Sequence, residues 1–458
     1  MKMNKTLPII LIFALCTVSA KAQETKEVQI ESESFQARQV DGMTVIELFR
    51  PILTHEETRL TAVNGLDEGN GYVRFWGSVR IVEKEDTIRA DRIRYHKDTK
   101  VAVVQGNVSM SDGEAFLTAP SAVHFSEADS TTFDDGVSYR DSLTVLTAER
   151  ATYLSENNRA HFSSRVTLSQ DQIQVYSDSL VYERDTERSW AWGRILVEQE
   201  SDSSLVFMMA DVMRRQAKVD SVQLTGNGLM ATIDAAQKDT LYVSAERYWM
   251  HESDSLRTVI ASDSVIVASS AYTTRTDSLV SKSGEADVKR SQLFGTPFIW
   301  LEDTQVTADS LTMLSTPSQP DSVFGFGEVF VATLESASER IQQIKAQRLV
   351  AVLDQDSLRS LKFEENAEAL FYSRERDDDP LTAVRASADG AIFYFTGGEV
   401  DSLGFYDGIE GTYYSESQMD KLSNLAGYIW VPENKPDRDE MANVIWSEIE
   451  LRRRHGLE

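Results

Sequence analysis

Two short segments decide the fold class: Ile88–Tyr95, which reads IRADRIRY, and Gly106–Met110, which reads GNVSM. In the first, apolar residues flank a small residue followed by an acid. Related copies occur at Leu146–Tyr153 and Val175–Tyr182. In the second, a glycine precedes alternating apolar residues, a pattern typical of a strand with a bulge or sharp bend near its start. The two patterns predict bent β-strands that recur along the chain.

Turn signals recur between these segments with unusual uniformity. Asp-Ser or Asp-Thr pairs, such as those at Asp141, Asp178 and Asp220, mostly precede an aliphatic residue by one or two positions. Asp and Ser side chains close turns by bonding to nearby backbone amides. Short strands at this spacing indicate a sandwich, a barrel or a solenoid, and a repeated turn-plus-strand unit favours stacked coils. This rhythm runs from Gly71 to about Tyr414.

The regions outside this rhythm differ in composition. Residues 23–70 are predicted to form a loosely ordered arm with one short docking strand at Met43–Phe49, which Pro51 ends. Residues 415–458 are predicted to be a linker followed by a short amphipathic helix over Asp439–Arg454, where apolar residues recur at helical spacing.

The N-terminus has the features of a cleaved signal peptide at residues 1–22. Lys2 and Lys5 precede the short apolar run Leu7–Ala14, and Ala20-Lys21-Ala22 is a small-x-small cleavage site. A lipoprotein signal acylated at Cys16 is the weaker alternative, because Leu15 is not small. Cys16 is the only cysteine, so the mature chain has to be stabilised by core burial without disulfides.

The formal net charge of −27 argues against binding to nucleic acid or to an anionic membrane surface. None of the six histidines lies at metal-ligand spacing from another, and no phosphate-binding loop, GxSxG or HExxH motif occurs. The sequence therefore predicts a protein that is not an enzyme and has no cofactor or metal. The repeated apolar face has two interpretations, an ordinary core or an open slot that accepts acyl chains.

The alternation of GNVSM-type strands with IRADRIRY-type units resembles the OstA-like family of lipopolysaccharide-transport proteins. The resemblance covers about residues 71–400 and implies an all-β fold, an elongated antiparallel β-jellyroll or solenoid-like stack of short strands, here with a short C-terminal helix. It implies one OstA-like jellyroll at residues 71–240 and a continued or second one at 241–414. In this family, acyl chains occupy the apolar interior, and jellyrolls join end to end into a bridge.

The resemblance also implies a site and partners. The expected partners are lipopolysaccharide, through its lipid A acyl chains, and other jellyroll transport proteins, which would pair by edge strands; an outer-membrane barrel is a further candidate. The expected location is the periplasm, with outer-membrane association as an extension. Two alternatives remain open: a structural β-solenoid with a sealed core, and a carbohydrate- or calcium-binding solenoid. The expected lipid-binding residues are Val79, Ile81, Ile93, Tyr95, Val108, Met110, Val166 and Leu168.

Overall fold

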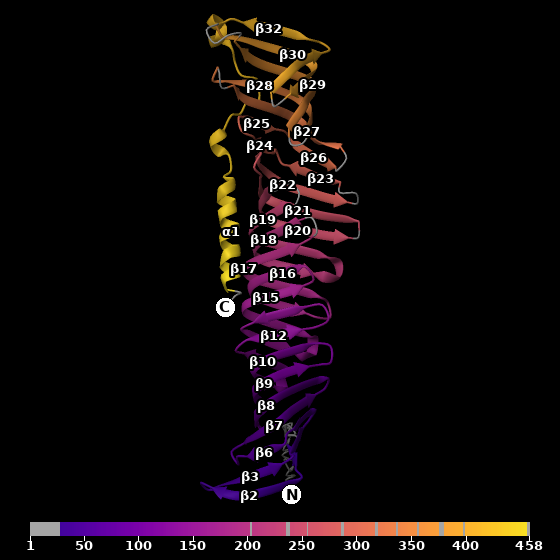
Figure 1. The fold of residues 1–458 in the computed structure, drawn as a ribbon, viewed down its shortest axis with the longest axis vertical. Coiled ribbons are helices and arrows are strands. Elements are labelled where there is room, and N and C mark those ends of the chain that lie inside the picture. The colour runs from indigo at the N-terminus through magenta and orange to yellow at the C-terminus, as the bar shows by residue number, and fades with distance from the viewer. Residues whose placement is uncertain are drawn as a thin grey trace, which may run out of the picture.

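The computed structural model describes residues 28–455 apart from the short segments 202–203, 235–238, 254, 285–287, 317–318, 336–337, 355–356, 375–379 and 397–398. The chain forms one long antiparallel ladder, in which consecutive strands stack along the long axis from the N-terminal to the C-terminal end (Figure 1). The all-β class and the elongated stack of strands are therefore confirmed.

The ladder contains thirty-two strands in the described residues. The N-terminal strands are β1 (Gln29–Glu31), β2 (Ser34–Val40), β3 (Met43–Phe49), β4 (Ile52–His55), β5 (Thr58–Thr61) and β6 (Asn64–Asp67). The next strands are β7 (Tyr72–Glu83), β8 (Asp86–His96), β9 (Val101–Ser111), β10 (Phe116–Phe125), β11 (Ser130–Asp134), β12 (Val137–Arg140), β13 (Val145–Ala148), β14 (Arg150–Leu154), β15 (Arg159–Gln170) and β16 (Ile173–Glu183). The central strands are β17 (Arg188–Glu200), β18 (Ser204–Gln216), β19 (Ser221–Asp234), β20 (Thr240–Ser253), β21 (Leu256–Ala268) and β22 (Thr273–Gly284). The last strands are β23 (Lys289–Phe294), β24 (Phe298–Trp300), β25 (Thr304–Thr307), β26 (Ser310–Thr316), β27 (Gln319–Glu335), β28 (Arg340–Asp354), β29 (Ser357–Ser373), β30 (Thr382–Thr396), β31 (Glu399–Tyr406) and β32 (Glu410–Tyr414).

Most long strands bend at a corner near their middle. At the corner of β9, Gly106 and Asn107 both have positive φ angles, and the register with the preceding strand shifts there. The same pair of positive φ angles occurs at Gly193 and Arg194 in β17. Asn107 donates to the carboxylate of Asp91 at 2.9 Å, so the acid of one unit lies over the corner of the next. The GNVSM and IRADRIRY segments are thus in contact at the corner, where Asn107 of the first meets Asp91 of the second.

A substitution at this corner should be costly, because a Cβ at Gly106 would overlap the Asp91 carboxylate. We expect Gly106→Ala to lower the free energy of unfolding by about 2–4 kcal/mol, from left-handed backbone strain plus the steric overlap. Gly113→Ala is the matched control, since Gly113 also has a positive φ but no atom lies within 4 Å of the place that a Cβ would take. Urea unfolding measures this loss. If both variants lose the same free energy of unfolding, the overlap with Asp91 contributes nothing to it.

The corners divide each long strand between two arms. Arm A ends in hairpins at residues 55–58, 83–86 and 111–116, and arm B ends in hairpins at residues 67–72 and 96–101, with later hairpins alternating in the same way. The two arms face each other over one apolar core, whose buried residues run without interruption from Leu53 to Phe393. Side chains alternate along each strand, so every second residue points into this core.

The structure differs from the sequence prediction in the N-terminal region. Residues 29–67 form six strands rather than one, and Leu53 and Leu60 are fully buried in the common core. Pro51 lies between β3 and β4, where its carbonyl accepts a hydrogen bond from the Ala62 amide. The proline therefore marks a corner, and the chain continues as part of the ladder. The predicted signal peptide at residues 1–22 lies outside the described residues.

The ladder also continues across the expected division at residue 240. β19 pairs with β20 from Ser221–His251 to Ile233–Thr240, and the apolar core continues on both sides. The described part of the chain forms one stack in this region.

The C-terminal segment turns back along the outside of the stack. Helix α1 (Arg438–His455) lies beside the central strands (Figure 1), close to the predicted helix over Asp439–Arg454. Its Ile445 and Ile449 are buried against outward-facing residues of arm A, including Phe207 and Leu229. Trp446 donates to the Tyr242 hydroxyl at 3.0 Å. No helix in the described part of the chain is long and apolar enough to cross a membrane.

Candidate functional site

The eight residues expected to bind lipid all point into the core between the two arms. They come from β7, β8, β9 and β15, and each is at most 2% exposed. Their neighbours Arg80 and Arg94 point outward and are exposed, so the alternation of side chains along these strands is clear. The structure brings the eight residues into one continuous apolar interior, and their contact with lipid stays a prediction. The residues concerned are Val79, Ile81, Ile93, Tyr95, Val108, Met110, Val166 and Leu168.

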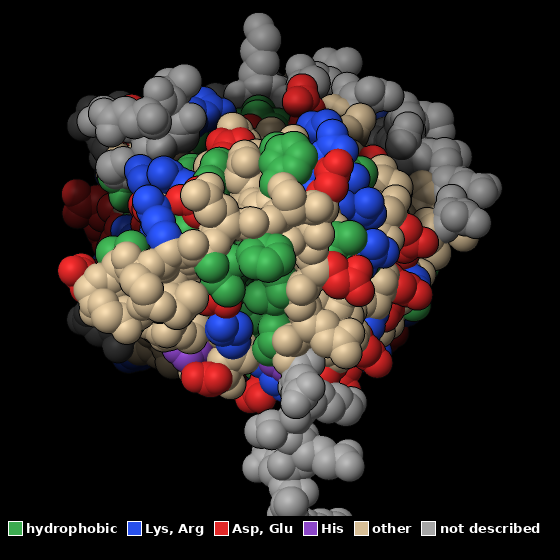
Figure 2. All heavy atoms as spheres, turned by 90° about the horizontal axis from the view of Figure 1, so that it is seen from below, with side chains coloured by type: hydrophobic (Ala, Val, Ile, Leu, Met, Phe, Trp, Pro, Cys, Tyr) green, Lys and Arg blue, Asp and Glu red, His purple; other side chains and the backbone are tan. Residues whose placement is uncertain are grey.

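The apolar interior reaches the surface at both ends of the stack. At the N-terminal end, Phe35 lies in register with Leu48, and Leu48 with Gly65, on the inward-facing side of arm B; Phe35 is 71% exposed. Figure 2 views this end and shows hydrophobic side chains gathered near its middle. At the C-terminal end, Leu403 pairs with the core residue Phe393 and is 44% exposed. At each end of the stack, the last inward-facing apolar side chain is therefore exposed and not covered by another strand of the described residues.

Along the side of the stack, the hairpin ends of arm A lie opposite those of arm B. We call the line along which they face each other the mouth. Polar side chains from opposite arms meet across this mouth. His55 contacts the Tyr95 hydroxyl at 2.8 Å, and Glu83 contacts His124 at 2.7 Å. Lys84 forms an ion pair with Asp129 at 2.6 Å. We call these cross-mouth pairs, with the Asp112–Arg184 pair described next, the polar seam.

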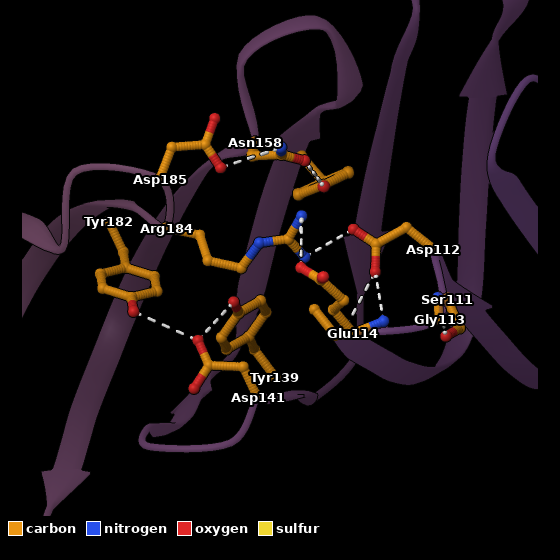
Figure 3. Close-up of polar contacts among 12 residues, drawn as sticks. Ser111, Asp112, Gly113, Glu114, Tyr139, Asp141, Asn158, Tyr182, Arg184 and Asp185 are labelled. Atoms are coloured by element: carbon orange, nitrogen blue, oxygen red, sulfur yellow. Dashed lines mark hydrogen bonds and ion pairs between the residues drawn. The ribbon is translucent and has the colours of Figure 1, made fainter.

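The densest part of the polar seam surrounds Arg184 (Figure 3). Its guanidinium forms an ion pair with Asp112 at 2.5 Å, and both side chains are largely buried, at 16% and 9% exposed. Burial tends to raise the pKa of Asp112, but hydrogen bonds from the Ala115 and Glu114 amides and from Arg184 lower that pKa overall. The same ion pair raises the pKa of Arg184, against the effect of its burial. The pair is therefore charged on both sides.

Two tyrosines close the mouth next to Arg184. Tyr139 and Tyr182 both donate hydrogen bonds to Asp141, at 2.8 and 3.2 Å. Burial, together with the nearby Asp141 carboxylate, raises the pKa of Tyr182 to about 12. Both phenols thus stay protonated at neutral pH and remain donors to the carboxylate.

His55, which contacts Tyr95, lies at the N-terminal end of the polar seam and links the stability of the fold to pH. Burial, followed by the nearby Lys100 charge, lowers the pKa of His55 below its ordinary value of 6.5. The unfolded chain then binds a proton more readily than the folded chain, so stability rises with pH in the window below 6.5 and is lost as the pH falls through it.

We therefore expect acidification from pH 7 to 5.5 to destabilise the protein, and His55→Gln to remove part of this dependence. Thermal unfolding over that pH range measures the effect. His161→Gln, at an exposed histidine, is the control and should leave the pH dependence in place. An unchanged pH profile in the His55 variant would contradict the prediction.

The interior and the polar seam differ in the chemistry of their side chains. Within the described ranges, no three or more His, Cys, Asp or Glu side chains are grouped to hold a metal ion. The inward-facing positions between corner and mouth carry mainly aliphatic and aromatic residues, and the polar seam contains the paired groups Glu83–His124 and Asp112–Arg184. Such an apolar lining with a polar edge can sequester apolar chains.

Sequence reasoning missed the polar seam. His124 is buried, and its ring nitrogens contact Glu83 and Thr131. Its partner Glu83 lies 41 residues away along the chain, so no local motif links them. The one available signal was a polar residue at an inward-facing position of a strand, as at His124 in β10 and Gln170 in β15.

Comparison with known protein families gives a match in the N-terminal part of the chain. The family model described as OstA-like protein matches residues 27–178, which covers β1 to β15 and the start of β16. The resemblance to the OstA-like family of lipopolysaccharide-transport proteins is therefore confirmed over this segment. The match begins at residue 27, in agreement with the strands found there. A comparison with curated proteins finds no match.

Proposed function

We propose that this protein is a non-enzymatic lipopolysaccharide-transport or outer-membrane assembly factor that carries lipid acyl chains in its apolar interior. The observation that carries the proposal is the single apolar core running from Leu53 to Phe393, with inward-facing apolar side chains exposed at both ends. The OstA-like match to residues 27–178 supports the same class of cargo.

The proposed mechanism is passive. Acyl chains are held by non-directional burial, which stabilises them by about 0.8 kcal/mol per methylene, while sugars and phosphates stay in water outside the mouth. Movement along the interior therefore changes little in burial energy from one strand to the next. Direction has to come from a partner that uses energy, and we place the protein in the periplasm, where β2 and β31 are the candidate edges for pairing with other jellyrolls.

The polar seam imposes a condition on this mechanism. A head group outside the mouth and an acyl chain inside cannot pass His55–Tyr95 or Glu83–His124 while those contacts are intact. Passage requires these contacts to break and re-form strand by strand. This is feasible because each pair joins only the two arms and leaves the backbone ladder unchanged.

A sealed structural solenoid is the second candidate, and the polar seam is the observation that favours it. In that case the apolar interior is an ordinary core, which native proteins pack densely. The seam then contributes stability and has no gating role. The two candidates differ in one testable respect, namely whether lipid ever contacts the inward-facing residues.

In-cell photocrosslinking tests the proposal. A photoreactive residue replaces Val79, Ile93 or Val108 in the inward set, and Arg80, Arg94 or Ser109 in the outward set. We expect lipopolysaccharide adducts only in the inward set. If neither set forms adducts although the protein is folded and exported, the transport proposal is wrong and the protein is a structural solenoid with a sealed core.

A further inference from the structure

Beyond β15, a cavity lies between the two arms at the mouth. It has a volume of about 80 Å³, and its floor is formed by apolar residues of β16 to β20. Three of the floor residues are methionines, Met208, Met213 and Met250. Methionine side chains are unbranched and flexible, so they can rearrange around a guest. The cavity is smaller than the roughly 300–1,000 Å³ of a typical preformed ligand pocket, so a chain has to displace these side chains to enter.

Two arginines stand at the rim of this cavity, on arm B. Arg215 donates to the side-chain oxygen of Gln170, and Arg257 donates to that of Gln199 at 3.3 Å. Both glutamines belong to arm A, so the contacts cross the mouth in the same way as the polar seam. We call Arg215 and Arg257 the rim arginines.

The rim arginines differ from Arg184 in their partners. Arg184 is neutralised by Asp112, whereas each rim arginine contacts a neutral amide. In the described part of the chain, neither rim arginine forms an ion pair with an Asp or Glu. Asp220 and Glu252 line the cavity but do not reach ion-pair distance. Burial lowers the pKa of Arg215, and the nearby carboxylates of Asp220, Asp171 and Glu187 offset this penalty only in part.

A partly buried guanidinium without a counter-ion is costly, and a ligand oxyanion would supply the missing charge. Arginine binds phosphate and carboxylate groups in a bidentate manner. The net charge of −27 repels anions over most of the surface, whereas this cavity is lined by two arginines, Arg215 and Arg257. The neutral glutamine contacts can be exchanged for a ligand oxyanion without leaving a carboxylate unpaired.

We propose that the cavity and the rim arginines form a binding site for a single anionic amphiphile, with an alkyl chain on the methionine floor and a phosphate-type head group on Arg215 and Arg257. This inference rests on the proposed function, since it locates within the interior the point where the head group is held. The site lies outside the segment matched by the OstA-like family model, which ends at residue 178.

Isothermal titration of the full mature chain with two probes of equal chain length tests the site. The probes are dodecyl phosphate and neutral dodecyl glucoside, both kept below their micelle concentrations. We expect dodecyl phosphate to bind at least about tenfold more tightly, the size of effect that charge-assisted hydrogen bonds produce. Inorganic phosphate at the same concentration should not displace it, because the alkyl chain contributes to affinity; full displacement would overturn the lipid part of the inference.

The variants separate the head-group site from general acyl binding. The double variant Arg215→Gln and Arg257→Gln should bind both probes equally, and Arg257→Lys should retain part of the preference for phosphate. Arg214→Gln is the matched control, since Arg214 is the exposed, outward-facing neighbour of Arg215 and should leave the preference intact. If the double variant does not fold, the salt dependence of the wild-type preference replaces it, and a preference that salt does not reduce overturns the inference.

The possible failures are distinguishable. Equal binding of the two probes by the wild-type chain overturns the rim arginines as a head-group site but leaves acyl binding intact. Binding of neither probe removes both this site and the proposed function.

Discussion

Replacing Asp112 with alanine should lower the free energy of unfolding by about 3–5 kcal/mol, the usual loss when one member of a buried ion pair is removed. The variant leaves the Arg184 guanidinium, whose side chain is only 16% exposed, without its counter-ion. It also removes the acceptor for the backbone amides of Glu114 and Ala115, at 2.9 and 2.8 Å, which shapes the 111–116 hairpin.

Urea unfolding measures this loss, with Asp134→Ala as the control. Asp134 forms an exposed ion pair with Arg150 at 3.1 Å, and such surface pairs contribute at most about 1 kcal/mol. The pKa of Asp112 is depressed in the folded chain, so its contribution is present above the ordinary carboxyl pKa and is lost at lower pH. Similar small losses for the two variants would mean that the polar seam does not hold the mouth closed.

Replacing Ile445 with alanine should have the second large effect, a loss of about 2–5 kcal/mol in the stability of the docked helix. Ile445 is fully buried between α1 and the outer face of arm A, where it joins a cluster with Phe207 and Tyr242. Ile449 and Trp446 pack in the same cluster, and polar contacts such as the Arg438–Asp239 ion pair at 3.1 Å add to the docking. Losing this packing should shift α1 towards the undocked state.

Limited proteolysis reports on this undocking directly. Ile445→Ala should expose α1 to rapid cleavage while the strand ladder stays resistant. Val444→Ala is the control, because Val444 is 48% exposed and contributes little packing. If α1 remains protected in the Ile445 variant, the packing of Ile445 does not decide whether the helix docks.

The sequence permitted prediction of the repeated elements but not of the contacts between them. The bend at Gly106 could be predicted because a glycine at the start of an alternating strand usually marks a bulge or a sharp bend. The role of Asp91 could not, since its partner lies on the next strand. The helix over Asp439–Arg454 was also predictable from its spacing, whereas its docking face on β18 to β20 depends on residues about 200 positions earlier.

The candidate site divides in the same way. Alternation placed Val79, Ile93 and Val108 on one face, and the structure puts them together in the interior. The polar seam and the rim arginines depend on contacts between residues 40 to 72 positions apart, such as Glu83–His124 and Arg184–Asp112. The repeat pattern of the sequence does not show which hairpin of arm A lies opposite which hairpin of arm B. These contacts can therefore be seen only in the three-dimensional stack.

The pairing of each strand with its successor has a consequence for how the chain acquires this structure. Nearly every backbone contact closes a short loop, so the entropy lost at each step is small and assembly can proceed by adding one hairpin to a finished edge. Such a chain can fold progressively from its N-terminal end as it elongates, in the manner of repeat proteins. Helix α1 is the exception: it binds strands made some 200 residues earlier, so it docks last and stabilises the centre only after the stack is complete.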